Sequence, residues 1–405
     1  MSSEPSSSLP TSSSALISGA GVAGLAVAAL LADAGWRVTV VERAEHLRAG
    51  GYAVDFRGDA STVLERLGLL DHLRSRARCT DNTWYVDRRG RRTARLPGEI
   101  MGGDLEVDRG ELLAALRDRA QEAGAKLVFG ASLASLHPQN GGVAVQLEGS
   151  RTDTIEPTVL IGADGLHSRV RRLAFGSTPN HVHPLGYAAA IATVHGDFAR
   201  EGEEFCSVPG ATVGVAAGST PGTTRAMFYL ADPDAPSTAD RTDPVAFLRA
   251  RFGGHGWIVP QLLDGLAAVD YLDAMCRVEL PRWTEGRVAL LGDAAWCASP
   301  LAGMGTTLAL LGAYTLAVEL TTADNASAAL PRFEQRMRGV VTAAQKLADG
   351  AGAFFIPRSR LMIGMRDLTY RTMRFLPWKN ALADVPERAA RTFDLRALEN
   401  HRPPI

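Results

Sequence analysis

Residues Ala15 to Glu45, ALISGAGVAGLAVAALLADAGWRVTVVERAE, decide how the rest of the chain is interpreted. Ala15 to Ser18 is predicted as a short buried strand, and Gly19 to Gly24 (GAGVAG) matches the pattern G-x-G-x-x-G. An alanine-rich helix is expected over Val22 to Ala34, and Arg37 to Glu42 (RVTVVE) is rich in the β-branched residues that favour strands. The order of strand, glycine turn, helix and strand predicts a dinucleotide-binding unit.

The glycines of this turn have separate physical roles. Gly19 is expected to make the tight turn, Gly21 to let the backbone approach a pyrophosphate, and Gly24 to let the helix pack closely on the strands. The helix begins at Val22 and Ala23, whose free N–H groups would present the positive end of the helix dipole to the phosphates.

The second strand ends in an acid, Glu42, followed by Arg43. A carboxylate at this position can accept hydrogen bonds from the ribose hydroxyls of a dinucleotide. Its negative charge would repel a 2′-phosphate, so NADP is not the expected occupant, and both residues are candidate cofactor contacts.

An apolar stretch so close to the N-terminus also fits a targeting segment, but three features disfavour that alternative. The leader MSSEPSSSLPTSSS carries one charge, on Glu4, whereas a secretory signal needs a basic segment before its apolar core. Glycines, Asp33 and Arg37 interrupt the stretch, and a spanning helix needs about 20 consecutive apolar residues. Residues 1–13 are predicted as a disordered leader, and a cytoplasmic location without membrane association is expected.

Composition and charge narrow the remaining classes. The chain has 405 residues, 46% apolar and 21% charged, which is typical of a globular protein with room for two domains. A net charge of −1 provides no bulk field that would attract nucleic acid or anionic lipid. The four cysteines are widely separated without a C-x-x-C, which predicts buried free thiols in a reducing compartment and no metal site.

Two distant segments each combine a buried strand with an acidic turn. Thr158 to Arg172 (TVLIGADGLHSRVRR) contains Asp164-Gly165 directly after its strand. Gly286 to Leu320 (GRVALLGDAAWCASPLAGMGTTLALLGAYTLAVEL) contains Asp293, a Pro/Gly-rich loop and a long apolar helix. Either one alone is compatible with an ordinary strand–turn–helix crossover. Together, in this order after the glycine turn, they are highly specific.

With these three segments, the chain resembles the flavoprotein monooxygenases of the para-hydroxybenzoate hydroxylase type, which are single-component FAD-dependent aromatic hydroxylases. The sequence GGDLEVDR at 102–109 is most similar to the branch of tetracycline-degrading and natural-product tailoring enzymes. The resemblance implies a mixed α/β fold with a Rossmann-like FAD domain of three-layer ββα architecture, an antiparallel-sheet substrate domain and C-terminal helices. The expected bounds are 14–78, 101–182 and 272–345 for the FAD domain, 79–100 and 183–271 for the sheet domain, and 346–405 for the helical segment.

The same resemblance assigns expected roles to individual residues. Arg48 and Arg109 lie where members of the family place arginines that contact FAD. Asp293 would hold the ribityl chain or pyrophosphate, while Asp164 and Gly165 would border the pyrophosphate and the route of NAD(P)H. The isoalloxazine ring would be lined by the loop from Pro300 to the helix start, with Gly303, Gly305 and Thr306.

Physical chemistry supports this last role independently. A glycine loop that opens a helix aims backbone N–H groups at whatever lies before it, and such groups stabilise the anion of a reduced flavin. One departure from the family is Thr307, where many relatives have Asn. A hydroxyl there can still cap the helix or contact the flavin edge, so the departure concerns one hydrogen bond and not the fold.

The region between the second and third segments has a different pattern. Short β-rich stretches at 186–194, 204–217 and 223–231, separated by turns, predict an antiparallel sheet, and 83–96 is predicted as a hairpin that joins it. The resemblance makes this sheet the roof of the substrate cavity. Because strand side chains alternate, only one parity of residues 227–229 can face that cavity. The candidate pocket residues are Tyr187, Met227, Phe228 and Tyr229.

The C-terminal stretch Phe354 to Trp378 mixes arginine with large apolar side chains. An amphipathic membrane helix is one interpretation. Pro357 and Pro377 limit its length, and the resembling family packs a C-terminal helix across its two domains, so packing is the favoured prediction.

The activity implied by the resemblance is reduction of FAD by NADH or NADPH, reaction with O₂ to a flavin C4a-hydroperoxide, and oxygen transfer to an aromatic or polycyclic small molecule. The enzyme would act as a monomer or homodimer, and no catalytic side chain is assigned because the cofactor carries the chemistry. The chain lacks both a W-x-W-x-I-P element and a lysine before Lys126, which argues against a halogenase. A reductase or dehydrogenase, a non-catalytic flavin-binding protein, and the choice among hydroxylation, epoxidation and Baeyer–Villiger oxidation stay open.

Overall fold

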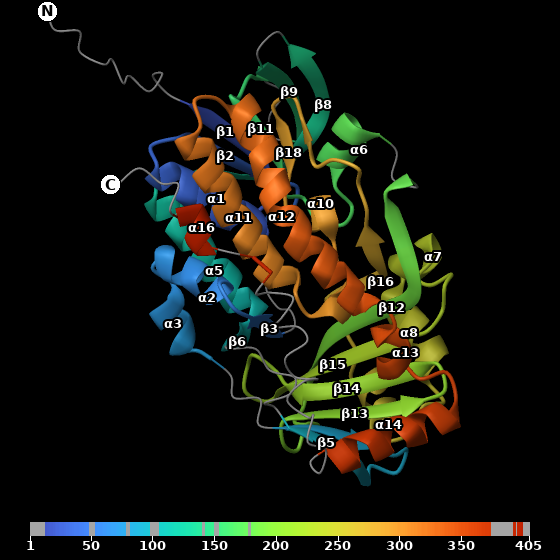
Figure 1. Cartoon of the computed structure of the whole chain (residues 1–405). Helices are drawn as coiled ribbons and strands as arrows, with labels where there is room; N and C mark the ends of the chain where they lie inside the picture. Colours follow the sequence, from blue (N-terminus) through green and yellow to red (C-terminus); the bar gives the residue numbers. More distant parts are fainter. Residues whose placement is uncertain are drawn as a thin grey trace, which may run out of the picture.

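The computed structural model describes residues 13–47, 53–77, 82–97, 105–139, 142–149, 154–176, 180–373, 392–393 and 395–399. Two bodies share this chain (Figure 1). One is built on a mainly parallel sheet and carries the glycine turn. The other is built on an antiparallel sheet that the C-terminal helices cover in part.

The parallel sheet brings the three sequence segments together. Its strand order is β17-β18-β11-β1-β2-β7. The strand that precedes the glycine turn, β1, lies between β2 and the strand of the Asp164 segment, β11, which in turn pairs with β18 of the Asp293 segment. The strands are β1 (Ser14–Ser18), β2 (Arg37–Glu42), β7 (Lys126–Phe129), β11 (Val159–Gly162), β18 (Val288–Leu290) and β17 (Thr284–Glu285), the last antiparallel to β18.

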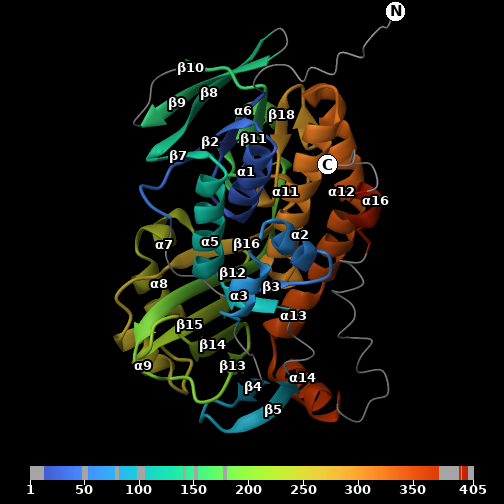
Figure 2. The ribbon, with the colours of Figure 1, turned by 90° about the vertical axis from the view of Figure 1, so that its left-hand side faces the viewer.

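Helices cover one face of this sheet and a second sheet covers the other (Figure 2). The helices are α1 (Val22–Asp33), α5 (Arg109–Glu122), α11 (Gly305–Thr322) and α12 (Ala326–Ala348), with α1 packed against both α5 and α11. The second sheet consists of β8 (Ala131–Gln139), β9 (Gly142–Gly149) and β10 (Thr154–Ile155). This arrangement is the predicted three-layer architecture.

Helix α11 is apolar nearly all round because it lies inside the protein: every residue from Thr307 to Leu320 is buried. It packs between α1 and α12. Among the helices of the described residues, none combines the length and apolarity needed to cross a membrane.

The second body is a seven-stranded sheet of order β16-β12-β15-β14-β13-β4-β5. Its strands are β4 (Asn82–Val86), β5 (Arg92–Pro97), β12 (Val182–His195), β13 (Glu203–Val208), β14 (Ala211–Ala217), β15 (Thr223–Leu230) and β16 (Tyr271–Val278). The predicted hairpin at 83–96 is confirmed, since β4 pairs with β5 and adds to the sheet through β13. One face of the sheet is covered by α8 (Pro244–Phe252) and α9 (Val259–Asp264), and α7 (Thr238–Thr242) precedes them.

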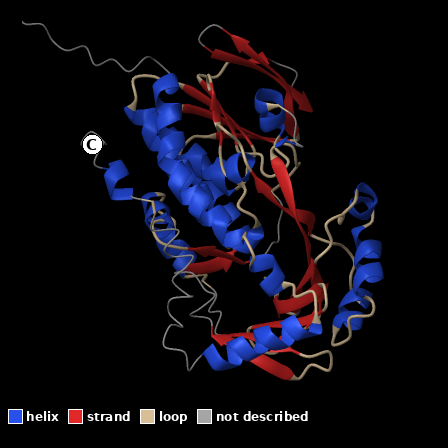
Figure 3. Ribbon diagram, turned by 45° about the vertical axis from the view of Figure 1, so that its right-hand side comes forward, coloured by secondary structure: helices blue, strands red, loops and turns tan. Residues whose placement is uncertain are grey.

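Short elements complete the described chain (Figure 3). They are β3 (Ala53–Phe56), α2 (Ala60–Arg66), α3 (Leu70–Arg74), β6 (Leu105–Asp108), α6 (Arg169–Phe175), α10 (Asp293–Trp296), the 3-10 helix η2 (Pro300–Ala302), α13 (Ala351–Phe355), α14 (Arg360–Met373) and α16 (Leu395–Glu399). Helix α14 packs on the antiparallel sheet, where Tyr370 stacks on Tyr85 of β4 with ring centroids 5.1 Å apart. One face of α14 thus packs on the antiparallel sheet, whereas the expected packing across both domains stays a prediction for this helix, and Trp378 lies outside the described residues.

Candidate functional site

The glycine turn is packed tightly against the Asp164 segment. Gly19 has a φ of 107°, and a Cβ there would fall on the carbonyl group of Ala163. A Cβ on Gly24 would fall on the carbonyl oxygen of Gly19 itself. Both positions therefore require glycine, one for backbone conformation and close approach and the other for close approach alone.

Gly21 is different, because it faces open space. Its φ of −82° suits any residue, and a Cβ there would meet no heavy atom within 4 Å. The same is true of the space beside Gly165, Gly303 and Gly305. These four glycines belong to the three fingerprint segments, so open space borders the glycine turn, the Asp164 turn and the loop before α11.

Glu42 connects the end of β2 to the glycine turn. Its Oε2 accepts a hydrogen bond from the backbone N–H of Ala20 and its Oε1 one from Ala44, each at 3.0 Å. Each carboxylate oxygen keeps a further lone pair for a ligand hydroxyl. Arg43 is exposed beside it, and Arg48 lies outside the described residues.

Asp164 accepts hydrogen bonds at the start of α6, whose N-cap residue is Ser168. Its Oδ1 accepts from the hydroxyl of Ser168 at 2.5 Å, and its Oδ2 accepts from the backbone N–H groups of Arg169 and Val170 at 2.7 and 3.2 Å. Gly165 follows with a φ of 75°. The acid therefore shapes the turn that Gly165 presents to the open side.

Arg171, which the sequence interpretation missed, joins the second segment to the third. Its guanidinium is completely buried and donates to the carbonyl oxygens of Ala294 at 2.9 Å and Leu166 at 2.5 Å. Burial lowers the pKa of Arg171 from its ordinary value. One side chain thus fixes the backbone beside Gly165 relative to the backbone beside Asp293. The only signal in the sequence was an arginine two residues beyond the basic start of α6.

Asp293 begins α10 and is accessible to solvent, although protein surrounds it closely. This environment raises the pKa of its carboxyl group, against the opposing effects of the Cys297 thiol and the Arg109 guanidinium. Gly292, just before it, packs against the Cβ of Ala23 in α1, which brings the third segment to the glycine turn.

The loop after α10 has one exposed side. Pro300, Gly303 and Gly305 are exposed, whereas Ala302 and Met304 between them are buried. Thr306, the second residue of α11, is half-buried.

Thr307 does not contact the open side. Its side chain is fully buried, and its hydroxyl oxygen accepts a hydrogen bond from the backbone N–H of Arg57 at 3.3 Å. The expectation that this hydroxyl contacts the flavin edge is therefore corrected. Thr307 instead connects α11 to the chain that follows β3.

Ser299 adopts a strained backbone conformation in this loop. It is buried and adopts φ 74° and ψ 147°, a region that residues other than glycine rarely occupy. Its hydroxyl oxygen accepts from the backbone N–H of Leu301 at 3.4 Å. Such strain persists where the surrounding structure fixes the backbone, and here it sets the direction of the chain into Pro300.

The residues that converge here fit FAD. A dinucleotide needs a backbone that can be approached closely at its pyrophosphate, and the open side of Gly21 at the start of α1 provides it. It also needs acids for the ribose and ribityl hydroxyls, and Glu42 and Asp293 border the same turn.

The candidate pocket residues on β15 lie on opposite faces of the sheet, because successive side chains of a strand alternate. Met227 and Tyr229 lie with Ile191, Phe205 and Phe355 of α13 on one face of the antiparallel sheet. Phe228 lies on the opposite face, with its ring centroid 5.1 Å from that of Phe252 in α8. Phe228 is therefore a core residue under the outer helices, and its inclusion among the pocket candidates is corrected.

Tyr187 lies in β12 beside α13. A Cβ added to Gly352 would collide with the ring of Tyr187, and the guanidinium carbon of Arg358 lies 5.8 Å from the ring centroid. Tyr187 is thus close to the C-terminal helices, which also contact η2.

Three polar contacts hold the antiparallel sheet against the candidate site. The Ser219 hydroxyl donates to Oδ2 of Asp108, the N-cap residue before Arg109, at 2.7 Å. The Val278 backbone N–H donates to the Cys297 carbonyl at 2.9 Å, and Nε2 of His167 lies 2.6 Å from Oδ2 of Asp273. Each contact joins the sheet to one of the segments that form the site.

Comparison with known proteins agrees with this geometry. The family model described as an FAD binding domain matches residues 12–348. An uncharacterized protein of Mycobacterium tuberculosis (strain ATCC 25618 / H37Rv) is 38% identical over 302 residues, which cover 72% of this chain and 80% of that protein. A flavin-dependent monooxygenase of an unknown prokaryotic organism is 31% identical over 319 residues, covering 77% of this chain and 82% of that protein.

Solved structures show the same fold. The tetracycline destructase Tet(51) superposes with a TM-score of 0.81 at 27% identity, covering 96% of this chain and 99% of that one. Klebsiella pneumoniae HpxO complexed with FAD and uric acid shares the fold with a TM-score of 0.72 at 23% identity, covering 92% of this chain and 96% of that one. The chain therefore belongs to the FAD-binding-domain family of flavin-dependent monooxygenases and is an oxidoreductase.

Proposed function

We propose that this enzyme uses NADPH or NADH and O₂ to hydroxylate an aromatic or polycyclic small molecule that carries an acidic oxygen. The substrate would lie between the loop Pro300–Gly305 and the face of the antiparallel sheet that bears Met227 and Tyr229. When bound, FAD supplies the electron transfer and oxygen chemistry. The chain's own residues bind the cofactor, orient the substrate and exclude water.

The proposed cofactor contacts follow from the open side of the fingerprint segments. Gly21 and the first N–H groups of α1 would bind the pyrophosphate, and Glu42 the adenosine ribose. Asp293 and Arg109 would hold the ribityl chain and phosphates. The exposed side of the loop, with Pro300, Gly303 and Gly305, would line the isoalloxazine ring, and the N–H groups at the start of α11 would favour negative charge on the edge of the ring that they face.

The observation that carries the substrate proposal is a buried arginine. Arg225 shares the parity of Met227 and Tyr229 on β15, and only 5% of its surface is exposed. Within the described chain, its Nε and Nη1 have no hydrogen-bond partner, and its Nη2 lies 3.9 Å from Oε1 of Glu203. A buried guanidinium with unused donors is unfavourable. Protein covers both atoms in this structure, so a ligand oxygen would accept from them only after a neighbouring side chain moves aside. A phenolate, enolate or carboxylate is the matching group.

The position of Arg225 supports this assignment. It pairs with Ala216 close to the turn between β14 and β15, and Ser219 of that turn is hydrogen-bonded to the N-cap of the helix that begins at Arg109. Arg225 thus lies close to a turn of the sheet that is hydrogen-bonded to the helix start of Arg109, one of the proposed flavin contacts.

The test is NADPH oxidation in air by the FAD-loaded protein with a panel of phenolic and enolic polycyclic compounds. Arg225→Gln is expected to raise KM for acidic substrates at least tenfold, as loss of a charge-assisted hydrogen bond predicts, without changing the flavin spectrum. Arg251→Gln, in α8 on the outer face, is the matched control and should leave KM unchanged. Equal KM values for both variants would refute the substrate proposal. Reduced flavin that accumulates in air would identify a dehydrogenase or reductase instead.

A further inference from the structure

The outer side of α14 carries an unusual row of exposed apolar side chains. Leu361, Met365 and Leu368 are 74%, 61% and 59% exposed, and Met362 beside them is also exposed. Their spacing of four and then three residues places them on one helix face about 10 Å long. The opposite face, with Arg366 and Tyr370, packs on the antiparallel sheet. The row is therefore not needed for the packing of the helix.

Arginines border this row. Arg360 and Arg371 are both exposed and stand about three turns apart, so they share the flank of α14 that also bears Asp367. Asp367 accepts a hydrogen bond from Thr93 of β5 at 2.7 Å, which shows that this flank faces the β4–β5 hairpin. Arg358 is exposed just before the helix begins.

The arginine flank continues into a cleft on the hairpin. The cleft has a volume of about 440 Å³ and is lined by Trp84, Asp87, Arg91, Arg92, Thr93, Ala94, Arg95 and Arg371. Arg371 therefore belongs both to the border of the apolar row and to the wall of the cleft. Four guanidinium groups face a single carboxylate, that of Asp87.

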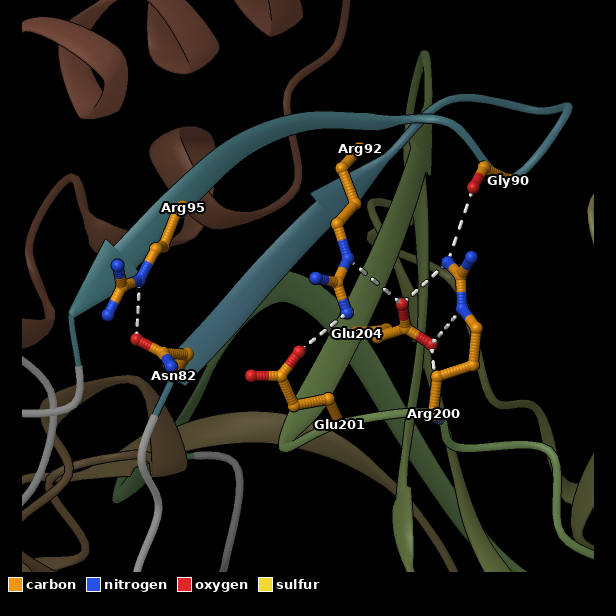
Figure 4. Close-up of polar contacts among 7 residues, drawn as sticks. All are labelled: Asn82, Gly90, Arg92, Arg95, Arg200, Glu201 and Glu204. Carbon is orange, nitrogen blue, oxygen red and sulfur yellow. Dashed lines mark hydrogen bonds and ion pairs between the residues drawn. The ribbon is translucent and has the colours of Figure 1, made fainter.

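Most of the positive charge in the cleft is not neutralised by the protein. Arg92 is balanced, with its Nη2 3.1 Å from Glu201 and its Nε 4.0 Å from the buried Glu204, as Figure 4 shows. Glu204 is itself held by Arg200 at 2.6 Å. In contrast, Arg95 donates from Nε only to the amide oxygen of Asn82, at 2.5 Å.

Neither of the other two cleft arginines is neutralised by an ion pair. In the described parts of the chain, Arg91 and Arg371, like Arg95, lie in no ion pair with a carboxylate. The cleft thus offers three guanidinium groups to an anion.

We propose that this face binds the surface of an anionic phospholipid bilayer. The row Leu361, Met365 and Leu368 would enter the boundary between headgroups and acyl chains, and Arg360, Arg371 and the cleft would bind lipid phosphates. Charge complementarity favours this occupant over a second copy of the chain. The only acid of α14, Asp367, is bound to Thr93 and Arg366, so antiparallel pairing of two α14 helices would bring like charges together. The contact would be peripheral and independent of the substrate proposed above, and it departs from the expectation of no membrane association that the sequence alone supports.

The test is co-sedimentation of the full-length, FAD-loaded protein with vesicles of pure phosphatidylglycerol or of pure phosphatidylcholine. Binding is expected for phosphatidylglycerol only, and high salt should weaken it because screening shortens the reach of the charges. Leu361→Gln/Met365→Gln/Leu368→Gln keeps helix propensity and should lower partitioning at least tenfold. Arg360→Gln/Arg371→Gln should lower it roughly fivefold for each arginine removed.

The matched control is Arg117→Gln/Arg282→Gln, which changes the net charge equally but lies in α5 and before β17. It should bind as the parent protein does, and all variants should keep the flavin spectrum and unfolding temperature of the parent. Failure to bind phosphatidylglycerol overturns the proposal, as does equal weakening in the control. Self-association that the triple variant abolishes, without vesicle binding, would assign the face to a second copy. A lower unfolding temperature of the triple variant without vesicle binding would assign it to the chain beyond Met373.

Discussion

The glycine turn and the inner face of the antiparallel sheet would specify their proposed ligands, FAD and the substrate, in opposite ways. The turn acts through backbone: Gly19 and Gly24 close it against the protein, while Gly21 keeps one side open. The sheet acts through side chains, and Arg225, Met227 and Tyr229 reach the same face because they alternate with residues that pack under α8 and α9. The proposed cofactor site is thus encoded locally, and the proposed substrate site by strand pairing over long sequence distances.

This difference explains why the two regions tolerate change differently. In the turn, a single methyl group decides whether the backbone can close or a phosphate can approach. On the sheet, adding or removing one methyl group of a side chain changes the shape of the cavity wall but leaves the backbone in place. Substitutions in the turn should therefore have the larger effects.

The largest effect is expected for Gly24→Ala. Its Cβ would fall on the carbonyl oxygen of Gly19, so α1 must move away from β1. We expect the free energy of unfolding of the apoprotein to fall by about 3 kcal/mol, as for a severe overpacking substitution. Urea denaturation of the apoprotein measures it.

Gly21→Ala is the matched control, since its Cβ meets no atom of the protein. The apoprotein should keep its stability to within about 1 kcal/mol. Its affinity for FAD, measured by fluorescence titration, should nevertheless fall more than tenfold, because the methyl group occupies the side that the pyrophosphate approaches. Equal stability losses in the two variants would show that the open and closed sides of the turn are assigned wrongly.

Asp293→Asn should separate stability from cofactor binding. Although Asp293 is accessible to solvent, the protein packed closely around its carboxyl group desolvates it and raises its pKa, so the folded state binds its proton more tightly than the unfolded state does. The apoprotein therefore loses stability as pH rises from about 4 through the raised pKa, and the loss persists at pH 7. The amide removes this dependence, so the variant apoprotein should be at least as stable as the parent at pH 7.

FAD affinity of Asp293→Asn should fall at least tenfold, because a charged acceptor for ligand hydroxyls is lost. Thermal unfolding of the apoprotein from acid to neutral pH and FAD titration measure the two effects. A variant apoprotein that is less stable at pH 7, or that binds FAD as the parent does, contradicts the assignment.

Most of the cofactor half could be predicted from sequence because its signals are local. The predicted strand Arg37–Glu42 has the observed bounds, and the helix predicted from Val22 begins there. The hydrogen-bond partners of Asp164 and Thr307 could not be predicted from the sequence. Whether an acid caps a helix or contacts a ligand depends on neighbours in space, and the partner of Thr307 is Arg57, 250 positions away in the chain.

The substrate half was predicted only in outline. Alternation showed that residues 227–229 must divide between two faces, but only the packing of Phe228 against α8 shows which face lies under the outer helices. Arg225 was not predicted as a site residue, because the feature that identifies it is a pair of buried donors without an acceptor in the described chain. That feature depends on packing and cannot be read from the sequence. Arg171 was missed for the same reason, since its acceptors are backbone carbonyls that carry no sequence signal.

The smallest expected effect tests the division of the sheet by parity. Phe228→Leu should lower the free energy of unfolding by about 1 kcal/mol, because the smaller side chain leaves part of the contact with Phe252 unfilled. It should leave KM for an identified substrate unchanged. Tyr229→Leu, on the neighbouring residue, should instead change kcat/KM about fivefold, as the loss of a contact of about 1 kcal/mol predicts. Since both substitutions stand on β15, a general weakening of the strand would alter both variants alike. If Phe228→Leu changed kcat/KM as much as Tyr229→Leu does, the cavity would not be confined to one face of the sheet.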